Sequence, residues 1–392
     1  MQLSLAKLLI LLASLTALTP LAIDAYLPAM PSMANSFNSS IHDIELSLSL
    51  FLAGFSLGEL YGGAMSDHVG RRQTIFTGLI IFSVGTLGII LSSSLTSLLT
   101  FRIIEAFGGG LAIVNSSAII RDISQGRNNA KNLSHMALIM MIAPLSAPLI
   151  GSSILHLTSW HGIFVFLFMY AVVVCLLIFR YIPETSPTKT HKISVIQRYL
   201  SVFKHREAVS YLLSLCFAYG GMFTFITASP SVYMGCFNVS EAIYPFLFGA
   251  NIISMIIANR LNVFLLNYFP PQRLLSLGQF IQFISAVVLL TYALLTPELA
   301  LWIVVSLIML FVGSQSFIVS NASSSTLEFF PHNSGTASAV LGASGYATGA
   351  VMGTVVGLLG DGTPLPMAQV MLMCITSGIT LRYLMSRLVN RD

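Results

Sequence analysis

The stretch GAMSDHVGRR, residues 63–72, carries the most information about the fold of this chain. It places an aspartate, two spaced glycines and a pair of arginines at the end of a long apolar segment. The glycines permit close approach and a tight turn, and the aspartate can accept hydrogen bonds from the arginines or from a neighbouring helix end. Two arginines alone would suffice as membrane anchors, so the spacing indicates a latch that holds one conformation of a moving transporter. The predicted latch residues are Gly63, Asp67, Gly70, Arg71 and Arg72.

The composition is that of an integral membrane protein. Hydrophobic residues make up 55% and charged residues 8% of the 392 positions, whereas roughly 25% of residues are charged in an ordinary soluble domain. Apolar runs that each suit one crossing of about 20 residues recur from residue 8 to residue 389, which excludes a soluble domain on a single anchor. The first run follows Lys7 as a signal peptide would, but Asp24 and Pro28 favour a helix that stays in the membrane.

The apolar runs predict an all-α membrane protein with twelve transmembrane helices in two six-helix halves. We divide the chain into an N-terminal half over 1–182, a polar cytoplasmic linker over 183–207 and a C-terminal half over 208–392. Two halves of similar length are typical of transporters built from repeats. The expected spans cover about 8–30, 45–66, 74–94, 98–120, 133–156, 160–182, 208–234, 241–265, 273–296, 299–320, 335–359 and 366–388.

The distribution of charge predicts the topology. An even number of spans puts both termini on one side, and every Lys and Arg except Arg102 falls at or near that side. The opposite loops contain no Lys or Arg and carry acids instead. This asymmetry follows the positive-inside rule, so we expect both termini in the cytoplasm. The acids of the opposite loops are Asp43, Glu45, Glu241, Glu298 and Asp361.

The sequence offers no catalytic residues and no metal site. It has neither a GxxxxGK[ST] phosphate loop nor an HExxH zinc motif. Ser344, between Gly342 and Gly345, lacks a histidine base, because no histidine follows residue 332. The cysteines lie on separate apolar segments without metal-binding spacing and are expected to pack as small hydrophobic residues. They are Cys175, Cys216, Cys236 and Cys374.

Among the ionisable residues of the expected spans, we single out four as intramembrane groups: Asp24, Glu59, Arg102 and Glu105. A charge at mid-membrane costs about 2.5–3.5 kcal/mol, so each needs a partner, a water-filled cavity or a function. Arg102 and Glu105 are three residues apart on one helix face and can pair. The pair is either structural, or Arg102 is a switchable counter-ion for Asp24 or Glu105.

Two interpretations are open for Asp24 and for Glu59. A carboxyl group in the outer half of the first span can carry a proton, because burial and nearby cations determine whether it is ionised. Asp24 is therefore either a proton carrier or the cap of an interfacial turn. Glu59 faces either a cavity or the charge network of the latch.

Glycines recur every four residues on two of the expected helices. Such stripes let helix backbones approach closely. Smooth faces of this kind also allow helices to rock, and the two helices could face each other. The stripes consist of Gly54, Gly58 and Gly62, and of Gly345, Gly349, Gly353 and Gly357.

These motifs resemble those of the major facilitator superfamily, and within it the drug-efflux group named for bicyclomycin and chloramphenicol resistance (Bcr/CflA). Residues 63–72 resemble the superfamily signature between helices 2 and 3. The segment containing Pro144, Pro148 and Gly151 is similar to the antiporter motif of helix 5. Further similar segments are 24–31, 50–54, 102–109, 121–122, 160–164, 183–185, 228–230 and 335–339.

The resemblance implies the major facilitator fold and proton-coupled export across a bacterial inner membrane. It also implies a central cavity lined by helices 1, 4, 7 and 10. Glu59 and Glu105 depart from the pattern, since relatives usually have Gln there, and His68 replaces the usual Arg or Lys. The two additional acids suit a cationic substrate or alter the number of protons exchanged.

The leading hypothesis is a proton-driven antiporter that exports small amphipathic compounds, with protonation of Asp24, and of Glu105, competing with substrate. The alternatives are a transporter of a metabolite (a nucleoside, an amino acid derivative or a siderophore) and, from another class, a channel or receptor. We expect no cofactor beyond the proton gradient, no nucleic-acid partner, a monomer in the lipid bilayer and a small-molecule substrate. The candidate cavity contacts are Tyr26, Phe107, Asn115, Tyr219, Phe223, Gln315 and Phe317.

Overall fold

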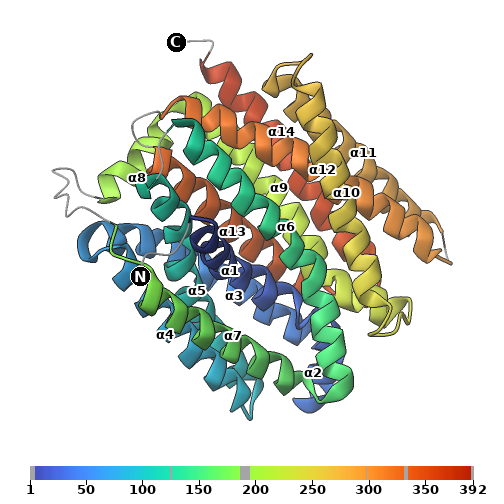
Figure 1. Cartoon of the computed structure of the whole chain (residues 1–392). Coiled ribbons are helices and arrows are strands. Elements are labelled where there is room, and N and C mark those ends of the chain that lie inside the picture. The colour runs from blue at the N-terminus through green and yellow to red at the C-terminus, as the bar shows by residue number, and fades with distance from the viewer. Residues whose placement is uncertain (1–4, 124–125, 186–194, 297, 331–333, 390–392) are drawn as a thin grey trace. The chain divides into compact units, whose positions relative to one another are not determined.

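The described part of the chain is built from long helices (Figure 1). The computed structural model describes residues 5–123, 126–185, 195–296, 298–330 and 334–389, and no strand occurs among them. Eleven helices are long and apolar enough to cross a membrane, and Ile142–Leu157 adds a shorter apolar stretch. The predicted all-α membrane fold is therefore confirmed.

The helices fall close to the expected spans. Every predicted span overlaps one long helix, and the ends differ by at most eight residues. The elements are α1 (Leu5–Asp24), η1 (Leu27–Ala29), α2 (Met30–Ser36), α3 (Ile41–Val69), α4 (Arg71–Ile90), α5 (Leu95–Ile123), α6 (Gly126–Leu157), α7 (Trp160–Tyr181), α8 (Val195–Lys204), α9 (Arg206–Pro230), η2 (Ser231–Cys236), α10 (Tyr244–Leu265), α11 (Pro271–Leu295), α12 (Leu301–Glu328), α13 (Ser334–Leu359) and α14 (Leu365–Val389).

The chain forms two compact units. The first contains Met1–Ser40 and Leu50–Ser194, and the second contains Ile41–Ser49 and Val195–Asp392. In the first unit α4 packs against α5 and α7, and α1 packs against α6. In the second unit α9 packs against α13 and α14, and α12 packs against α10 and α11. Helix α8 lies within the segment that we expected to be a polar linker, and the first turns of α3 belong with the second unit.

The first expected span is broken where its acid lies. Helix α1 ends at Asp24, and the 3₁₀ turn Leu27–Ala29 precedes α2, which runs on to Ser36. Proline has no N–H to donate and fixes its own backbone angle. Pro28 in the turn therefore interrupts the regular α-helix here, while Ala6–Ser36 as a whole still forms one candidate membrane span.

The glycine stripe of α3 packs within its own unit. A Cβ at Gly54 or Gly58 would meet the carbonyl oxygens of Ile103 and Phe107, and one at Gly62 would meet the backbone of Leu111, all on α5. These glycines therefore set how closely α3 approaches α5. The expectation that α3 and α13 could face each other is met near the start of α3, where a Cβ at Gly353 or Gly357 of α13 would meet Ser49 or Leu46.

The first two glycines of the α13 stripe, Gly345 and Gly349, pack against aromatic rings of α9. A Cβ at Gly345 would meet the Tyr219 ring, and one at Gly349 would meet the Phe223 ring, both on α9. These glycines leave room for aromatic rings. These two glycines of α13 therefore make space for side chains of α9, whereas the glycines of α3 make space for the backbone of α5.

Candidate functional site

Arg102 lies at the centre of a buried charge cluster in the first unit. Its side chain and that of Glu105 are both 0% exposed. Arg102 Nη1 donates to Glu105 Oε2 at 2.6 Å, and Nη2 donates to the Ala22 carbonyl of α1 at 3.2 Å. Thr86 of α4 donates its hydroxyl to the second Glu105 oxygen at 2.9 Å. The predicted pair is present, and it joins α1, α4 and α5.

Aromatic rings surround the Arg102 guanidinium. Its central carbon lies 4.4 Å from the ring centroids of Tyr26 and Phe51, and 5.8 Å from that of Phe164. Cation–π contacts of this kind stabilise a cation where water is excluded. Arg102 Nε has no hydrogen-bond partner, so one donor remains available. Tyr26, predicted as a cavity contact, belongs to this cage.

Asp24 lies beside the cluster without joining it. It is 4% exposed, and its Oδ1 has no hydrogen-bond partner. No ion pair within 4.0 Å connects Asp24 to Arg102 in the described chain, and η1 has no side-chain cap. The carboxylate is thus a buried acceptor close in sequence to Ala22, whose carbonyl binds the guanidinium.

Helix α6 reaches the same segment from another direction. Pro144 and Pro148 lie inside α6, and a Cβ at Gly151 would overlap the carbonyl oxygen of Ala25. Only glycine permits this approach. The Gly151 position of the predicted antiporter motif therefore packs directly against the residue that follows Asp24.

Glu59 is separate from the latch. It is half-buried on α3, and its Oε2 has no hydrogen-bond partner. No hydrogen bond or ion pair described in the structure joins it to residues 63–72. Of the two interpretations of Glu59, membership of the latch network finds no support in this geometry.

Arg71 is the centre of the latch. Its Nη1 donates to the Ser66 hydroxyl at 2.6 Å and to Asp67 Oδ1 at 3.3 Å. Its Nε donates to Asp122 Oδ2 at the end of α5, also at 3.3 Å. The guanidinium thereby joins the end of α3, the start of α4 and the end of α5.

Glu184 closes the latch at the start of α4. Its carboxylate accepts from the backbone N–H of Arg71 at 2.8 Å and of Arg72 at 3.2 Å. Anions at a helix N-terminus satisfy free donors and interact favourably with the helix dipole. Gly70 has φ +99°, and a Cβ there would contact this carboxylate, which explains why glycine precedes α4.

Arg72 joins the latch through its backbone N–H, which donates to Glu184, while its side chain contacts α7. Its Nη2 donates to the Phe179 carbonyl near the end of α7 at 2.5 Å, and its guanidinium lies 4.9 Å from the Phe179 ring centroid. Sequence reasoning named Asp122 and Glu184 only as members of similar motifs, and it missed their contacts with Arg71. The available signal was the acid in each of the similar segments 121–122 and 183–185, since either acid could pair with an arginine of the latch.

The predicted cavity aromatics of the second unit lie together. Tyr219 and Phe223 stack at 6.0 Å, and Tyr346, which was not predicted, lies 6.0 Å from Tyr219 and 5.5 Å from Phe223. Tyr219 also lines a small hollow of about 190 Å³ with Ser323 and Ser338. This cluster is the best candidate for cargo contact in the second unit.

Other predicted cavity residues are occupied by packing. Gln315 is 2% exposed and accepts from Gln282 Nε2 at 3.1 Å, and Phe317 is 3% exposed beside Gly278 of α11. In the first unit Phe107 lies 6.1 Å from the Tyr61 ring. Asn115 donates to the Leu111 carbonyl at 3.0 Å and keeps Oδ1 without a partner. Phe107 and Asn115 thus lie on α5 of the first unit, and Gln315 and Phe317 on α12 of the second.

The fold and the buried charge cluster define a helical membrane transporter of two units. The chain matches the Major Facilitator Superfamily over residues 12–354. It is 31% identical to the Bicyclomycin resistance protein homolog of Haemophilus influenzae, over 96% of this chain and 95% of the relative. It is 29% identical to the Chloramphenicol resistance protein of Pseudomonas aeruginosa, over 95% and 88% of the two chains. The chain belongs to the major facilitator superfamily, in the Bcr/CflA group that its motifs resemble.

Solved structures show the same fold. An inward-facing, unoccupied structure of a bacterial homologue of the human lysosomal transporter Spinster matches with a TM-score of 0.73 at 16% identity, covering 98% of this chain and 97% of the other. A partially occluded inward-open structure of the xylose transporter XylE from E. coli matches with a TM-score of 0.71 at 15% identity, over 98% and 97% of the chains. The chain is therefore a multi-pass bacterial membrane transporter of the major facilitator fold and not an enzyme.

The latch permits a first prediction. Replacing Glu184 with glutamine keeps the side-chain shape but weakens two charge-assisted bonds to α4. We expect amide hydrogen exchange at residues 71–74 to rise about tenfold, because such a bond contributes roughly 1–1.5 kcal/mol. Thr185→Val is the matched control, since it removes only the hydroxyl bond to Asp122. Equal exchange in the Glu184→Gln variant and the wild type would show that Glu184 does not hold the start of α4.

Proposed function

We propose that this protein is a proton-coupled antiporter of the bacterial inner membrane that exports small amphipathic compounds by alternating access. One observation carries the proposal: Arg102 is fully buried and paired with Glu105, while the neighbouring acid Asp24 keeps a carboxylate oxygen without a partner. The resistance names of the relatives support export of antibiotic-like compounds. The proton gradient is the proposed energy source, and the protein works without a cofactor.

Arg102, Glu105 and the nearby Asp24 together supply one cation and two acids that can exchange partners. Arg102 has one donor, Nε, without an acceptor, and Asp24 has one acceptor, Oδ1, without a donor. In the proposed cycle Asp24 binds a proton from the periplasm, and it releases the proton when a cation or water reaches it. Glu105 holds Arg102 in the meantime, and transfer of the guanidinium between the two acids couples the proton to the conformational change.

The latch and the charge asymmetry supply the remaining parts. The network around Arg71 stabilises one conformation at the side that carries the positive charge, which we assign to the cytoplasm together with both termini. The Tyr219 and Phe223 cluster offers flat apolar surface to an amphipathic cargo. The transporter acts as a monomer that handles its cargo, protons and the lipid bilayer.

Asp24→Asn tests the proton step. In everted vesicles with a preset pH gradient, adding chloramphenicol or bicyclomycin should dissipate the gradient through the wild-type protein. The Asp24→Asn variant should dissipate the gradient at least about tenfold more slowly, because an amide neither binds nor releases a proton at the pH of the assay. Asp43→Asn, which changes an acid at the start of α3, should retain the wild-type rate. The antiport mechanism is wrong if neither compound dissipates the gradient, or if Asp24→Asn matches the wild type.

A further inference from the structure

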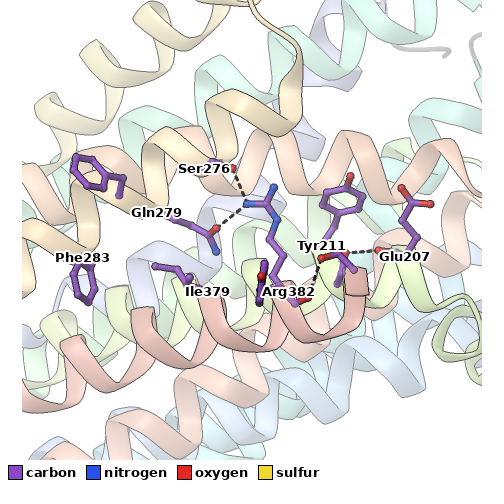
Figure 2. A pocket seen from close by; sticks show the side chains of 11 residues that line it. Glu207, Tyr211, Ser276, Gln279, Phe283, Ile379 and Arg382 are labelled. Atoms are coloured by element: carbon purple, nitrogen blue, oxygen red, sulfur yellow. Dashed lines mark hydrogen bonds between the residues drawn. The ribbon is translucent and has the colours of Figure 1, made fainter. Parts of the chain in front are cut away.

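The second unit contains a hollow that the proposed transport cycle does not use. It has a volume of about 650 Å³ and lies between α9, α11 and α14 (Figure 2). Its position is the start of α9 and α11 and the end of α14, the same end at which Arg206, Arg273 and Arg387 lie. The hollow is therefore at the positively charged end of this unit.

One side of the hollow is formed by Arg382, whose guanidinium is held by hydrogen bonds to neutral groups. Arg382 Nη1 donates to Gln279 Oε1 at 2.8 Å and to the Ser276 hydroxyl at 3.1 Å, and Nη2 donates to the Gln272 carbonyl at 3.4 Å. Its guanidinium lies 6.0 Å from the Tyr211 ring centroid. No described carboxylate lies within 4.0 Å of it, since the described ion pairs involve other residues. A guanidinium fixed in this way is suited to a phosphate group.

Gln279 adds a second donor to the same side. It is 4% exposed, and its Nε2 has no hydrogen-bond partner. A buried amide donor without a partner is destabilising unless a ligand or water accepts its hydrogen bond. Because the Gln279 oxygen already binds Arg382, the free donor lies beside the guanidinium and can serve the same anion.

The remaining walls are apolar and acidic. Phe280 is 61% exposed on the outer surface of α11, and Phe283 and Ile379 continue the apolar wall. Glu207, in the first turn of α9, supplies a carboxylate, and in Figure 2 the Tyr211 ring stands between it and Arg382. The hollow thus combines a cationic side with a free amide donor, a separate carboxylate and an exposed apolar wall.

We propose that this hollow binds a zwitterionic phospholipid with a primary ammonium group, of the phosphatidylethanolamine class. The phosphate binds Arg382, the Gln279 amide and the Ser276 hydroxyl, and the ammonium binds Glu207. An acyl chain lies along Phe280 and Phe283. A purely anionic headgroup matches Arg382 but is repelled by Glu207, and a choline headgroup has no N–H to donate to that carboxylate.

Native mass spectrometry of the purified, delipidated full-length protein tests the headgroup. We expect phosphatidylethanolamine to bind more tightly than phosphatidylglycerol or phosphatidylcholine with the same acyl chains. Arg382→Gln should weaken its binding about tenfold, as expected for one lost charge-assisted contact. Arg273→Gln, which removes an exposed arginine outside the hollow, should leave binding unchanged.

Glu207→Gln gives the sharpest result, because it removes the acid without removing the phosphate site. We expect phosphatidylethanolamine to lose its advantage and phosphatidylglycerol to bind at least as well. The proposal is overturned if phosphatidylglycerol already equals phosphatidylethanolamine in the wild type, or if Glu207→Gln leaves their ratio unchanged. It is also overturned if soluble glycerophosphoethanolamine displaces the lipid at equal concentration, which would identify a soluble ligand.

A transport measurement separates this proposal from the proposed function. Native mass spectrometry measures lipid binding without any transport step, so the lipid proposal can hold even if the proton-antiport proposal fails. If Arg382→Gln abolishes export while lipid binding is unchanged, the hollow belongs to the cargo path and the lipid proposal is wrong. Arg382→Lys guards against misfolding, since it retains the charge and should bind more weakly than the wild type but better than Arg382→Gln.

Discussion

Replacing Arg102 with alanine is expected to abolish transport and to destabilise the protein by about 3–5 kcal/mol, the usual effect of removing one partner of a buried ion pair. Glu105 would remain 0% exposed with only the Thr86 hydroxyl as donor. The Ala22 carbonyl would lose its side-chain donor, and the rings of Tyr26 and Phe51 would lose the cation between them. Thermal unfolding of the purified protein and the vesicle assay measure the two effects.

A double variant separates the structural role of this pair from its role in coupling. Arg102→Met with Glu105→Gln removes both charges and keeps similar volumes, so most of the lost stability should return. Transport should not return if Arg102 is the switchable counter-ion, because a neutral side chain cannot exchange acids. Arg102→Lys keeps a charge but loses the planar fork, and we expect intermediate transport. Wild-type transport by the double variant would show that the pair is only structural.

Local spacing explains what could be predicted from the sequence. Long apolar runs must form helices in a bilayer, because every backbone group needs an internal hydrogen bond there. This rule located every predicted span. The interval of three residues placed Arg102 and Glu105 on one helix face, and the interval of four placed Asp67 within reach of Arg71. These contacts form within one helix or across one turn.

Contacts between distant segments could not be predicted in this way. Glu184 binds the Arg71 backbone across 113 residues, and Arg72 reaches the Phe179 carbonyl across 107. Hydropathy also does not distinguish a lipid-facing side of a membrane helix from a side packed on its neighbours, since both are apolar. Phe317 was therefore expected in a cavity although it packs beside Gly278 of α11. The surroundings of Asp24 and Glu59 depend on such packing as well.

Gly151→Ala is expected to reduce transport at least about tenfold, although it adds a single methyl group. The Cβ would overlap the Ala25 carbonyl, so α6 must move away from α1 beside Asp24. Overpacking of this kind costs about 1–3 kcal/mol. Both the vesicle assay and thermal unfolding of the purified protein follow the change, and the loss of transport should exceed what the loss of folded protein explains.

Gly109→Ala is the matched control for this prediction. Gly109 is also a buried helix glycine of the first unit, but a Cβ there would make ordinary contacts of 3.4 Å and longer with the Phe82 and Phe55 rings. We expect nearly wild-type transport and stability from this variant. If Gly151→Ala behaves like Gly109→Ala, the close approach of α6 to α1 is not needed for transport. If only Gly151→Ala loses transport, the glycine of the antiporter motif acts by bringing α6 to the backbone beside Asp24, which connects this motif physically to the proposed proton carrier.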